Sequence, residues 1–287
     1  MQKLRAYYQL VKPGVMYGNV LTGAAGFLLA AGGEIDWWLF VATIVGMTLV
    51  VSAACVLNNY LDRDIDSKMT RTKARPSVTG AVSPRSILIY SIVLGVLGVG
   101  ILAFWTNWLV VTIGIVGFVT YVWFYGAWSK RQSIHGTLVG SISGAMPIAG
   151  GYAAVSGTID IGMLLAFAVM FFWQFPEFYS IAIYRRKEYA AAKVPVMSVV
   201  KGVRSSIVQI YIYTGLYVVS TLALMFTGLT GWVYFVVMAL FGLHWMWIGY
   251  QGLRTTEPEK WAKRMFRFAM INVLVFCVMC GLGPILP

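Results

Sequence analysis

Charged residues are scarce in this sequence. Only 11% of its 287 residues are Asp, Glu, Lys or Arg, whereas 59% are hydrophobic. Soluble globular domains average about 25% charged residues, so the composition excludes an ordinary soluble domain. Long linkers and low-complexity tracts are also missing. The sequence therefore predicts a membrane protein in which residues 1–287 form a single integral-membrane domain.

Cysteine is rare as well, with three residues in the chain. Cys277 and Cys280 have the C-x-x-C spacing that is typical of some redox and metal sites. Both fall in an apolar stretch that has no second cysteine pair and no nearby basic residue. Packing as small apolar side chains is therefore the favoured interpretation.

Long apolar stretches are abundant, and nine of them approach the roughly 20 residues that a membrane-crossing helix needs. They lie at about 14–31, 38–60, 86–104, 108–128, 136–155, 161–180, 206–226, 231–250 and 267–285. The predicted fold class is an all-α membrane protein, a bundle of nine transmembrane helices.

Charge is distributed unevenly between the two sides of these stretches. All 22 Lys and Arg fall on one side, whereas the other side has only Glu34, Asp36 and Asp160. The positive-inside rule then predicts a cytoplasmic N-terminus and an external C-terminus. The net charge of +12 is explained by topology and by contact with anionic membrane lipid, and nucleic-acid binding is excluded.

Acids are concentrated where the second stretch ends, in the sequence NNYLDRDID at residues 58–66. Asn58, Asp62 and Asp66 are four residues apart, so they stack on one face of a helix. Like charges repel at this spacing, and the helix dipole is negative at the same end. Mg²⁺ bound by the carboxylates would relieve this conflict, with Asn58 adding a neutral polar group. Asp64 lies about 200° around the helix from Asp62 and is predicted to face away and to pair with a base.

A second interpretation of the same stretch stays open. It is a solvated helix end whose acids pair with Arg63, Lys68 and Arg71. The adjoining segment SKMTRTKARP favours a metal–diphosphate site, because basic side chains neutralise outer phosphate oxygens while carboxylates hold the metal. More charged residues end the fourth and sixth stretches on the same side. They are Lys130, Arg131, Glu177, Arg185, Arg186, Lys187, Glu188, Lys193 and Lys201.

The segment NNYLDRDIDSKMTRTKARP resembles the N-x-x-x-D-x-x-x-D motif of the UbiA-type intramembrane prenyltransferases. The segments KPG, SKRQS and PVMSVVKG resemble the branch of that family that farnesylates heme, and the similarity covers most of the chain. The resemblance implies nine helices around a central cavity, Mg²⁺ as cofactor, and farnesyl diphosphate and heme B (protoheme IX) as substrates. The implied product is heme O for terminal oxidases, made in a bacterial cytoplasmic (inner) membrane with the active site facing the cytoplasm. Heme A synthase or oxidase subunits are the expected protein partners.

Carried over by position, the resemblance implies catalytic roles for Asn58, Asp62 and Asp66. Metal ligation is expected from Asp62, Asp66 and Glu188. Diphosphate binding is expected from eight basic residues, namely Arg71, Lys73, Arg75, Lys130, Arg131, Arg186, Lys187 and Lys201.

Heme contact is expected from His135, His244, Trp173 or Gln174, although a lone His in an apolar helix is more often hydrogen-bonded in the core. The chain departs from the family pattern at Glu177, where many members have His in a W-Q-x-P-H motif. It also has Glu188 in place of Asp. No heme-ligand role is therefore predicted for position 177.

A farnesyl carbocation would need an electron-rich pocket, and aromatic side chains near the same helix ends could provide cation–π contacts. The candidates are Tyr121, Trp123, Phe124, Tyr125, Phe171, Phe172 and Trp173. Three alternative functions remain: prenylation of an aromatic quinone precursor, cation transport, and non-catalytic heme handling. Acids clustered at one face beside bases favour a diphosphate site over an ion path.

Overall fold

The computed structural model describes residues 2–287, and these residues form helices joined by short connections. Within this range nine helical spans are long and apolar enough to cross a membrane, as the sequence predicts. They are α2 (Pro13–Ala31), α3 (Trp37–Leu61), α6 (Pro84–Trp105), α7 (Trp108–Val119) continued by η1 (Thr120–Ser129) and α8 (Lys130–Gln132), α9 (Gly136–Ser156), α10 (Ile161–Tyr184), α13 (Val203–Ala223) continued by η2 (Leu224–Thr227), α14 (Trp232–Gly252) and α15 (Pro258–Leu282).

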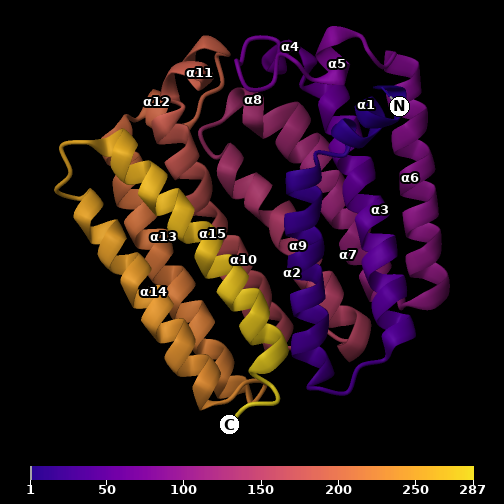
Figure 1. The fold of residues 1–287 in the computed structure, drawn as a ribbon, viewed down its shortest axis with the longest axis vertical. Helices are drawn as coiled ribbons and strands as arrows, with labels where there is room; N and C mark the ends of the chain where they lie inside the picture. The colour runs from indigo at the N-terminus through magenta and orange to yellow at the C-terminus, as the bar shows by residue number, and fades with distance from the viewer. Residues whose placement is uncertain (1) are drawn as a thin grey trace.

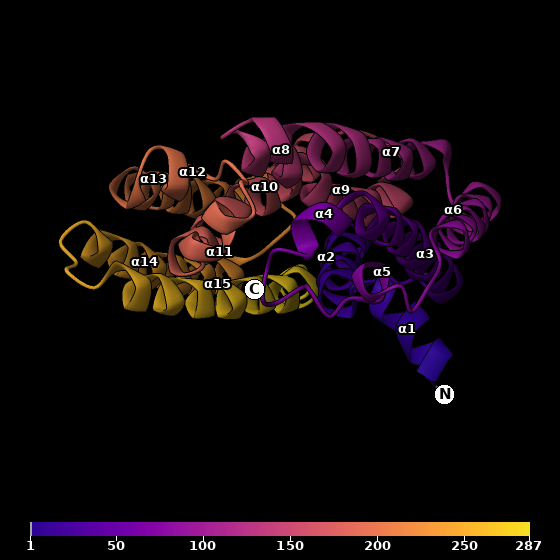
Figure 2. The same ribbon diagram turned by 90° about the horizontal axis from the view of Figure 1, so that it is seen from above.

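Five short helices complete the chain and lie together at one end of the bundle, at the top of Figure 1. They are α1 (Gln2–Leu10), α4 (Arg63–Asp66), α5 (Pro76–Thr79), α11 (Arg186–Ala191) and α12 (Met197–Val200). Seen from that end, α13, α14 and α15 form one side of the bundle, and α3, α6 and α7 form the other (Figure 2). The helices α2, α9 and α10 lie between these two sides.

The acids on the sparsely charged side have a structural role as helix caps. Asp36 accepts a hydrogen bond of 3.0 Å from the Leu39 backbone N–H at the start of α3. Asp160 does the same for Met163, at 2.9 Å, at the start of α10. A side-chain oxygen at this position satisfies one of the free N–H groups that every helix start carries. Two of the three acids on that side are therefore explained by capping.

Close contact between α2 and α9 depends on glycine. A Cβ atom at Gly26 would meet the Ile148 carbonyl oxygen, and one at Gly151 would meet the Gly23 carbonyl oxygen. Small residues allow helix backbones to approach closely within a membrane.

Two other glycine pairs with small-xxx-small spacing, Gly14/Gly18 and Gly140/Gly144, have different surroundings. Added Cβ atoms at Gly140 and Gly144 would meet the side chains of Tyr125 and Gln174. At Gly14 and Gly18 an added Cβ would have nothing within 4 Å, and both glycines line the central cavity. Among residues 2–287, Gly14 and Gly18 therefore make no close helix contact.

The last span begins earlier than its hydropathy predicts. We expect it at 267–285, whereas α15 runs from Pro258 to Leu282. Its first turns carry Lys260, Lys263 and Arg264, which lower the local hydropathy without breaking the helix. Hydropathy detects only the apolar part of a membrane helix, so it misses the polar turns by which α15 extends beyond the hydrocarbon core of the membrane.

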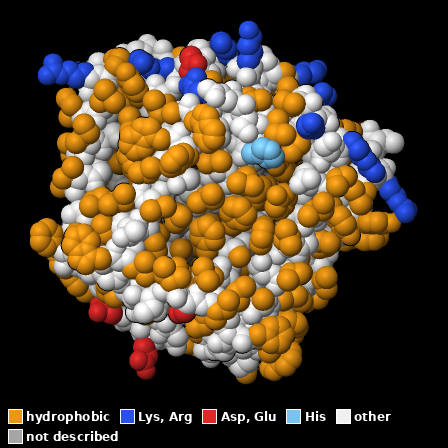
Figure 3. Space-filling model, turned by 180° about the vertical axis from the view of Figure 1, so that it is seen from behind, with side chains coloured by type: hydrophobic (Ala, Val, Ile, Leu, Met, Phe, Trp, Pro, Cys, Tyr) orange, Lys and Arg blue, Asp and Glu red, His pale blue; other side chains and the backbone are white. Residues whose placement is uncertain are grey.

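Figure 3 shows blue Lys and Arg side chains along one end of the molecule and red acids mainly at the other, with a broad hydrophobic band between them. Exposed apolar side chains on the membrane-spanning helices include Leu97, Phe104, Val219 and Leu240. A belt of exposed apolar side chains between two polar ends is the pattern of a protein that lies across a bilayer.

Candidate active site

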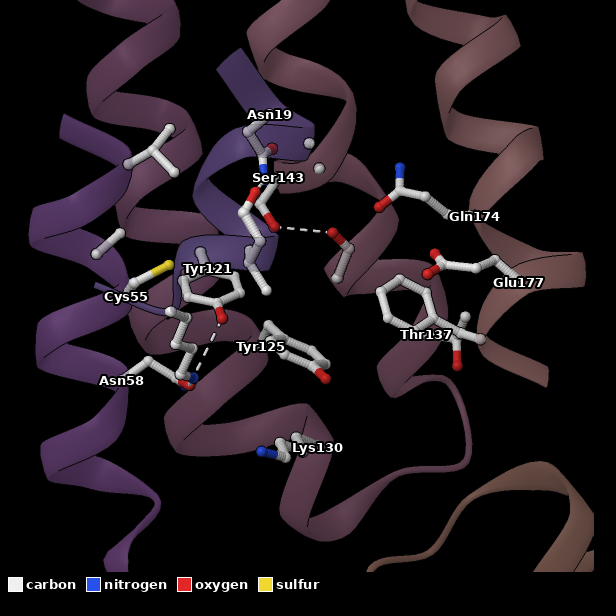
Figure 4. Close-up of a pocket in the computed structure, with 18 of the residues that line it drawn as sticks. Asn19, Cys55, Asn58, Tyr121, Tyr125, Lys130, Thr137, Ser143, Gln174 and Glu177 are labelled. Carbon is white, nitrogen blue, oxygen red and sulfur yellow. Dashed lines mark hydrogen bonds between the residues drawn. The ribbon is translucent and has the colours of Figure 1, made fainter. Parts of the chain in front are cut away.

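A cavity of about 760 Å³ lies between the central helices and is lined by residues of α2, α3, α7, η1, α9, α10 and α15. Its polar residues include Asn58, Asp62 and Asp66 from the region where α3 meets α4. In Figure 4, Cys55 and Asn58 project from α3 on one side, whereas Gln174 and Glu177 project from α10 on the other. The predicted central cavity is present, and the acid motif lines it.

The chain bends at Asp62 without losing the four-residue stacking. Helix α3 ends at Leu61, and α4 begins at Arg63. The backbone N–H of Asp62 donates to the Asn58 carbonyl at 2.9 Å, and that of Asp66 donates to the Asp62 carbonyl at 2.8 Å. The side chains of Asn58, Asp62 and Asp66 are all buried and line the same cavity.

Only one of the two carboxylate oxygens of Asp62 accepts a hydrogen bond within residues 2–287. Its Oδ2 atom accepts a hydrogen bond of 2.5 Å from the Lys130 ammonium, and Arg131 lies 3.9 Å from Oδ1. The Oδ1 atom is buried and has no hydrogen-bond partner within residues 2–287. A buried carboxylate oxygen without a partner is costly, so this atom is suited to receive a ligand.

The other two motif residues have different partners. Asp66 Oδ2 accepts from Arg75 at 2.6 Å, and its backbone carbonyl accepts from the Thr72 hydroxyl at 3.0 Å. Asn58 Oδ1 accepts from Lys12 and, at 3.5 Å, from the Tyr121 hydroxyl, whereas Asn58 Nδ2 is buried without an acceptor. Two of the three side chains at this end of the cavity therefore leave a polar atom unsatisfied.

Asp64 faces away from the cavity, as the helix geometry predicts. Both of its carboxylate oxygens accept 2.8 Å hydrogen bonds from Arg131, which also donates to the Leu61 carbonyl at 2.6 Å. The Arg131 hydrogen bonds lower the pKa of Asp64 to about 2, despite an opposing effect of partial burial. Arg131 therefore holds the α3–α4 bend in place, and it does not line the cavity.

The alternative interpretation, a solvated helix end, predicts that these acids pair with Arg63, Lys68 and Arg71. That pairing is wrong. Asp62 pairs with Lys130 and Arg131 from the end of the fourth span, and Asp66 pairs with Arg75. The sequence neighbours Arg63 and Lys68 form no ion pair with these acids among residues 2–287. The motif is thus buried and linked to a distant span rather than solvated.

Only some of the predicted diphosphate-binding residues line the cavity. Arg71, Arg75 and Lys130 do so. The remaining five lie outside the lining, namely Lys73, Arg131, Arg186, Lys187 and Lys201.

Two cationic residues line the cavity although the diphosphate prediction omits them, Lys12 and Arg185. Lys12 precedes α2 and has a left-handed backbone, with φ of 51°. Burial and the nearby charge of Arg75 lower the pKa of Lys12 to about 8, against the opposing effect of Asp62. Its place in KPG, directly before the proline that opens a span, is the sequence signal that could have identified it.

Glu188, the third predicted metal ligand, pairs with Arg185 at 2.8 Å. Burial lowers the pKa of Arg185, but the hydrogen bonds and charge interactions with Glu188 and Tyr184 together outweigh this effect and leave that pKa raised. Among the described residues, no three His, Cys, Asp or Glu side chains come together as a metal site. The donor atoms available for Mg²⁺ are therefore those of Asp62 and Asp66, with Asn58 beside them. Mg²⁺ usually takes one or two carboxylates and fills its other positions with water and phosphate, so this set fits the ion.

The four predicted heme contacts divide evenly. Trp173 and Gln174 line the cavity, where Trp173 donates to the Ala269 carbonyl at 2.9 Å and Gln174 donates to the Ser141 carbonyl at 3.0 Å. His135 and His244 are exposed and lie outside the lining. The His244 ring packs against Phe268, with 4.8 Å between ring centroids.

A π-helical segment, η1, continues the fourth span and was not predicted from the sequence. Such wide turns are rare and often occur at functional sites. Here Tyr121 and Tyr125 stack at 5.7 Å and line the cavity. Lys12 lies 6.0 Å from the Tyr121 ring centroid, and Lys130 lies 5.9 Å from that of Tyr125.

Several predicted cation–π residues lie elsewhere. Trp123 and Phe124 are each 52% exposed on the outer surface, which suits an apolar environment outside the bundle. Phe171 and Phe172 pack against the core and do not line the cavity. Of the seven aromatic candidates, Tyr121, Tyr125 and Trp173 line it.

Comparison with known protein families gives a clear result. Residues 19–272 match the UbiA prenyltransferase family. The chain belongs to the UbiA prenyltransferase family. It is 43% identical to a protein of Chromobacterium violaceum named protoheme IX farnesyltransferase 2, over 96% of this chain and 92% of the relative. It is 42% identical to protoheme IX farnesyltransferase of Klebsiella pneumoniae, over 99% of this chain and 96% of the relative.

Solved structures of UbiA-family proteins share the fold. A digeranylgeranylglyceryl phosphate synthase superimposes with a TM-score of 0.81 at 17% identity, covering 98% of this chain and 99% of that protein. A UbiA homologue from Archaeoglobus fulgidus, solved with GPP and Mg²⁺, gives a TM-score of 0.72 at 14% identity, covering 96% and 99%. The predicted all-α UbiA-type fold is confirmed.

Proposed function

We propose that this protein transfers the farnesyl group of farnesyl diphosphate to a vinyl group of heme B, with addition of water, to give heme O and diphosphate. The proposal is supported by 42–43% identity to relatives named protoheme IX farnesyltransferase over nearly the whole chain. It is also supported by a cavity that joins a charged end to a long apolar interior.

The observation that carries the proposal is the unsatisfied Asp62 Oδ1 atom, buried at the cavity end beside Asn58 and Asp66. Two carboxylates and surrounding cations form a binding site for a metal–diphosphate and not for either ion alone. Mg²⁺ bound there would stabilise negative charge on the departing diphosphate. Lys12, Arg75 and Lys130 would bind the outer phosphate oxygens and orient the C1–O bond for cleavage.

The apolar part of the cavity would hold the farnesyl chain. Its walls include Met47, Val50, Ile113 and Met170, which exclude water from the reacting carbon. The stacked rings of Tyr121 and Tyr125 would stabilise positive charge that develops as the diphosphate leaves. The vinyl group of heme would attack that carbon, with Trp173 and Gln174 in contact with the heme substrate.

We place the site at the cytoplasmic side of a bacterial inner membrane, with the N-terminus inside and the C-terminus outside. The concentration of Lys and Arg at the end that holds α4, α5, α11 and α12 supports this orientation. A single prenyltransferase domain would comprise residues 1–287. Heme A synthase or terminal oxidase subunits would receive the product.

Analysis of cellular heme tests the proposal. Heme extracted from a bacterial host that lacks its own activity should contain heme B alone, and expression of this gene should add hydroxyethylfarnesyl heme. A second assay tests the quinone-precursor alternative, in which membranes are supplied with 4-hydroxybenzoate and a prenyl diphosphate. Prenylation of that phenol without any new heme would favour the quinone-precursor alternative.

A further inference from the structure

The proposed reaction releases one proton on the acceptor side, away from the site that binds the diphosphate. When the vinyl group has attacked the farnesyl carbon, the positive charge moves to the carbon next to the heme ring. Water then bonds to that carbon and must lose a proton to become the hydroxyl group. A proton acceptor on the heme side of the cavity would promote this step.

Glu177 lies in the cavity wall, on α10, one turn beyond Gln174. In Figure 4 its carboxylate points into the cavity from the wall opposite Asn58 and Tyr121. Ion pairs within residues 2–287 do not include Glu177, and no side chain donates a hydrogen bond to it there. An acid within the membrane-spanning part of a protein is costly and is usually functional.

The other acids of the cavity are poorly suited to this task. Asp62 and Asp66 are paired with Lys130 and Arg75 and belong to the diphosphate end. Histidine, the commonest general base, occurs only at positions 135 and 244, both outside the lining. Phenols such as Tyr125 are neutral at ordinary pH and accept protons weakly. Glu177 is the remaining carboxylate among the described residues that line the cavity, and Lys12 belongs to the diphosphate end through its hydrogen bond to Asn58.

We infer that Glu177 is the general base that takes the proton from water as the hydroxyl group of the product forms. This inference rests on the proposed function. The C1–O bond of farnesyl diphosphate breaks, and its electron pair leaves with the diphosphate. The vinyl π electrons form the new C–C bond, and a water lone pair forms the C–O bond. The water proton moves to the Glu177 carboxylate and later to solvent, so no oxidant or reductant is needed.

The position of Glu177 also separates two tasks of the site, the binding of the leaving group and the removal of a proton. The motif carboxylates where α3 meets α4 would bind the leaving group through Mg²⁺, whereas the α10 carboxylate serves the acceptor on the opposite wall. Gln174, held by the carbonyls of Ser141 and Met170 at 3.0 Å each, lies one turn away and would orient the same substrate. Glu177 itself has no such fixed partner in the part of the chain that the structure describes, so its carboxylate can bind water.

The test compares Glu177→Gln, which keeps the shape but accepts no proton, with Glu177→His, which restores a base. Full-length protein in detergent receives heme B, farnesyl diphosphate and Mg²⁺, and the products are identified by mass spectrometry. Glu259→Gln, at an exposed position on α15, is the matched control. We expect kcat for hydroxylated product to fall about 100-fold in Glu177→Gln, the lower range for loss of a general base. The KM for farnesyl diphosphate should stay unchanged, and any farnesylated heme should lack the added water.

Partial recovery of hydroxylated product in Glu177→His would support the inference. Wild-type kcat and product in Glu177→Gln would overturn it, as would equal loss of activity in the Gln and His variants. Failure of the wild-type protein to farnesylate heme at all would instead overturn the proposed function.

Discussion

Lys130 and Asp62 come from different spans and meet in a 2.5 Å ion pair at the polar end of the cavity. Their side chains are 17% and 1% exposed, so the pair is largely removed from water. Only one carboxylate oxygen of Asp62 is used, and the other has no hydrogen-bond partner. The pair therefore fixes the orientation of Asp62 and leaves a donor atom available for a metal–diphosphate.

Replacing Asp62 by Asn should lower kcat/KM for farnesyl transfer by roughly 100-fold or more, because the carboxylate charge proposed to bind Mg²⁺ is lost. Asp64→Asn is a matched control, since Asp64 faces away from the cavity and is 60% exposed. Its activity should stay within about threefold of wild type, as surface ion pairs contribute little. Steady-state assays on equal amounts of inserted protein measure both effects. Full activity in Asp62→Asn would contradict the metal assignment.

Diphosphate affinity should fall as pH rises through about 8, where Lys12 loses its proton. Below about pH 8 the Lys12 side chain is a charged ammonium and binds an anion. Above that pH it is a neutral amine and does not, so the affinity falls as the pH rises. Lys12→Arg should remove this step, because a guanidinium stays charged. Calorimetric titration with diphosphate and Mg²⁺ on either side of pH 8 provides the comparison. Equal pH dependence in both proteins would show that another group is responsible.

Mg²⁺ and diphosphate should stabilise the folded protein together more than either does alone. A ligand at 100 times its Kd adds about 2.7 kcal/mol to the free energy of unfolding. The melting temperature in detergent should therefore rise when both are present, and chelation of Mg²⁺ should reverse the rise. The same additions should leave the melting temperature of Asp62→Asn nearly unchanged. A rise of equal size in that variant would mean that the ligands bind elsewhere.

Gly151→Ala should destabilise the protein by about 1–3 kcal/mol, because the new methyl group would collide with the Gly23 carbonyl oxygen of α2. Gly100→Ala on α6 is its control, since nothing lies within 4 Å of an added Cβ there. That change should be neutral or slightly stabilising, as Ala favours helix. Thermal unfolding in one detergent compares the two. Similar melting temperatures would argue against a tight α2–α9 contact.

The fold and the acid motif were largely predictable because they depend on local rules. Apolar length located the nine spans, and the basic residues predicted which ends of the spans lie on the same side. Four-residue spacing placed Asn58, Asp62 and Asp66 on one face, and the 200° offset separated Asp64 from them. These predictions require only the geometry of a single helix.

The rest of the site depends on contacts between helices and could not be predicted this way. The pairing of Asp62 with Lys130 joins residues 68 positions apart. Lys12 and Arg185 line the cavity in addition to the predicted basic residues because of where their spans end in space. The π-helical turns of η1, which determine where Tyr121 and Tyr125 lie, leave no clear mark in the sequence.

Heme farnesylation by the purified protein is measured in a single reaction. Purified protein is incubated with heme B, farnesyl diphosphate and Mg²⁺, and the extracted heme is weighed by mass spectrometry alongside an Asp62→Asn sample. We expect the wild-type protein to convert heme B to hydroxyethylfarnesyl heme with release of diphosphate. The Asp62→Asn variant should give negligible conversion. Unchanged heme B with wild-type protein, or equal conversion by both proteins, would contradict this expectation.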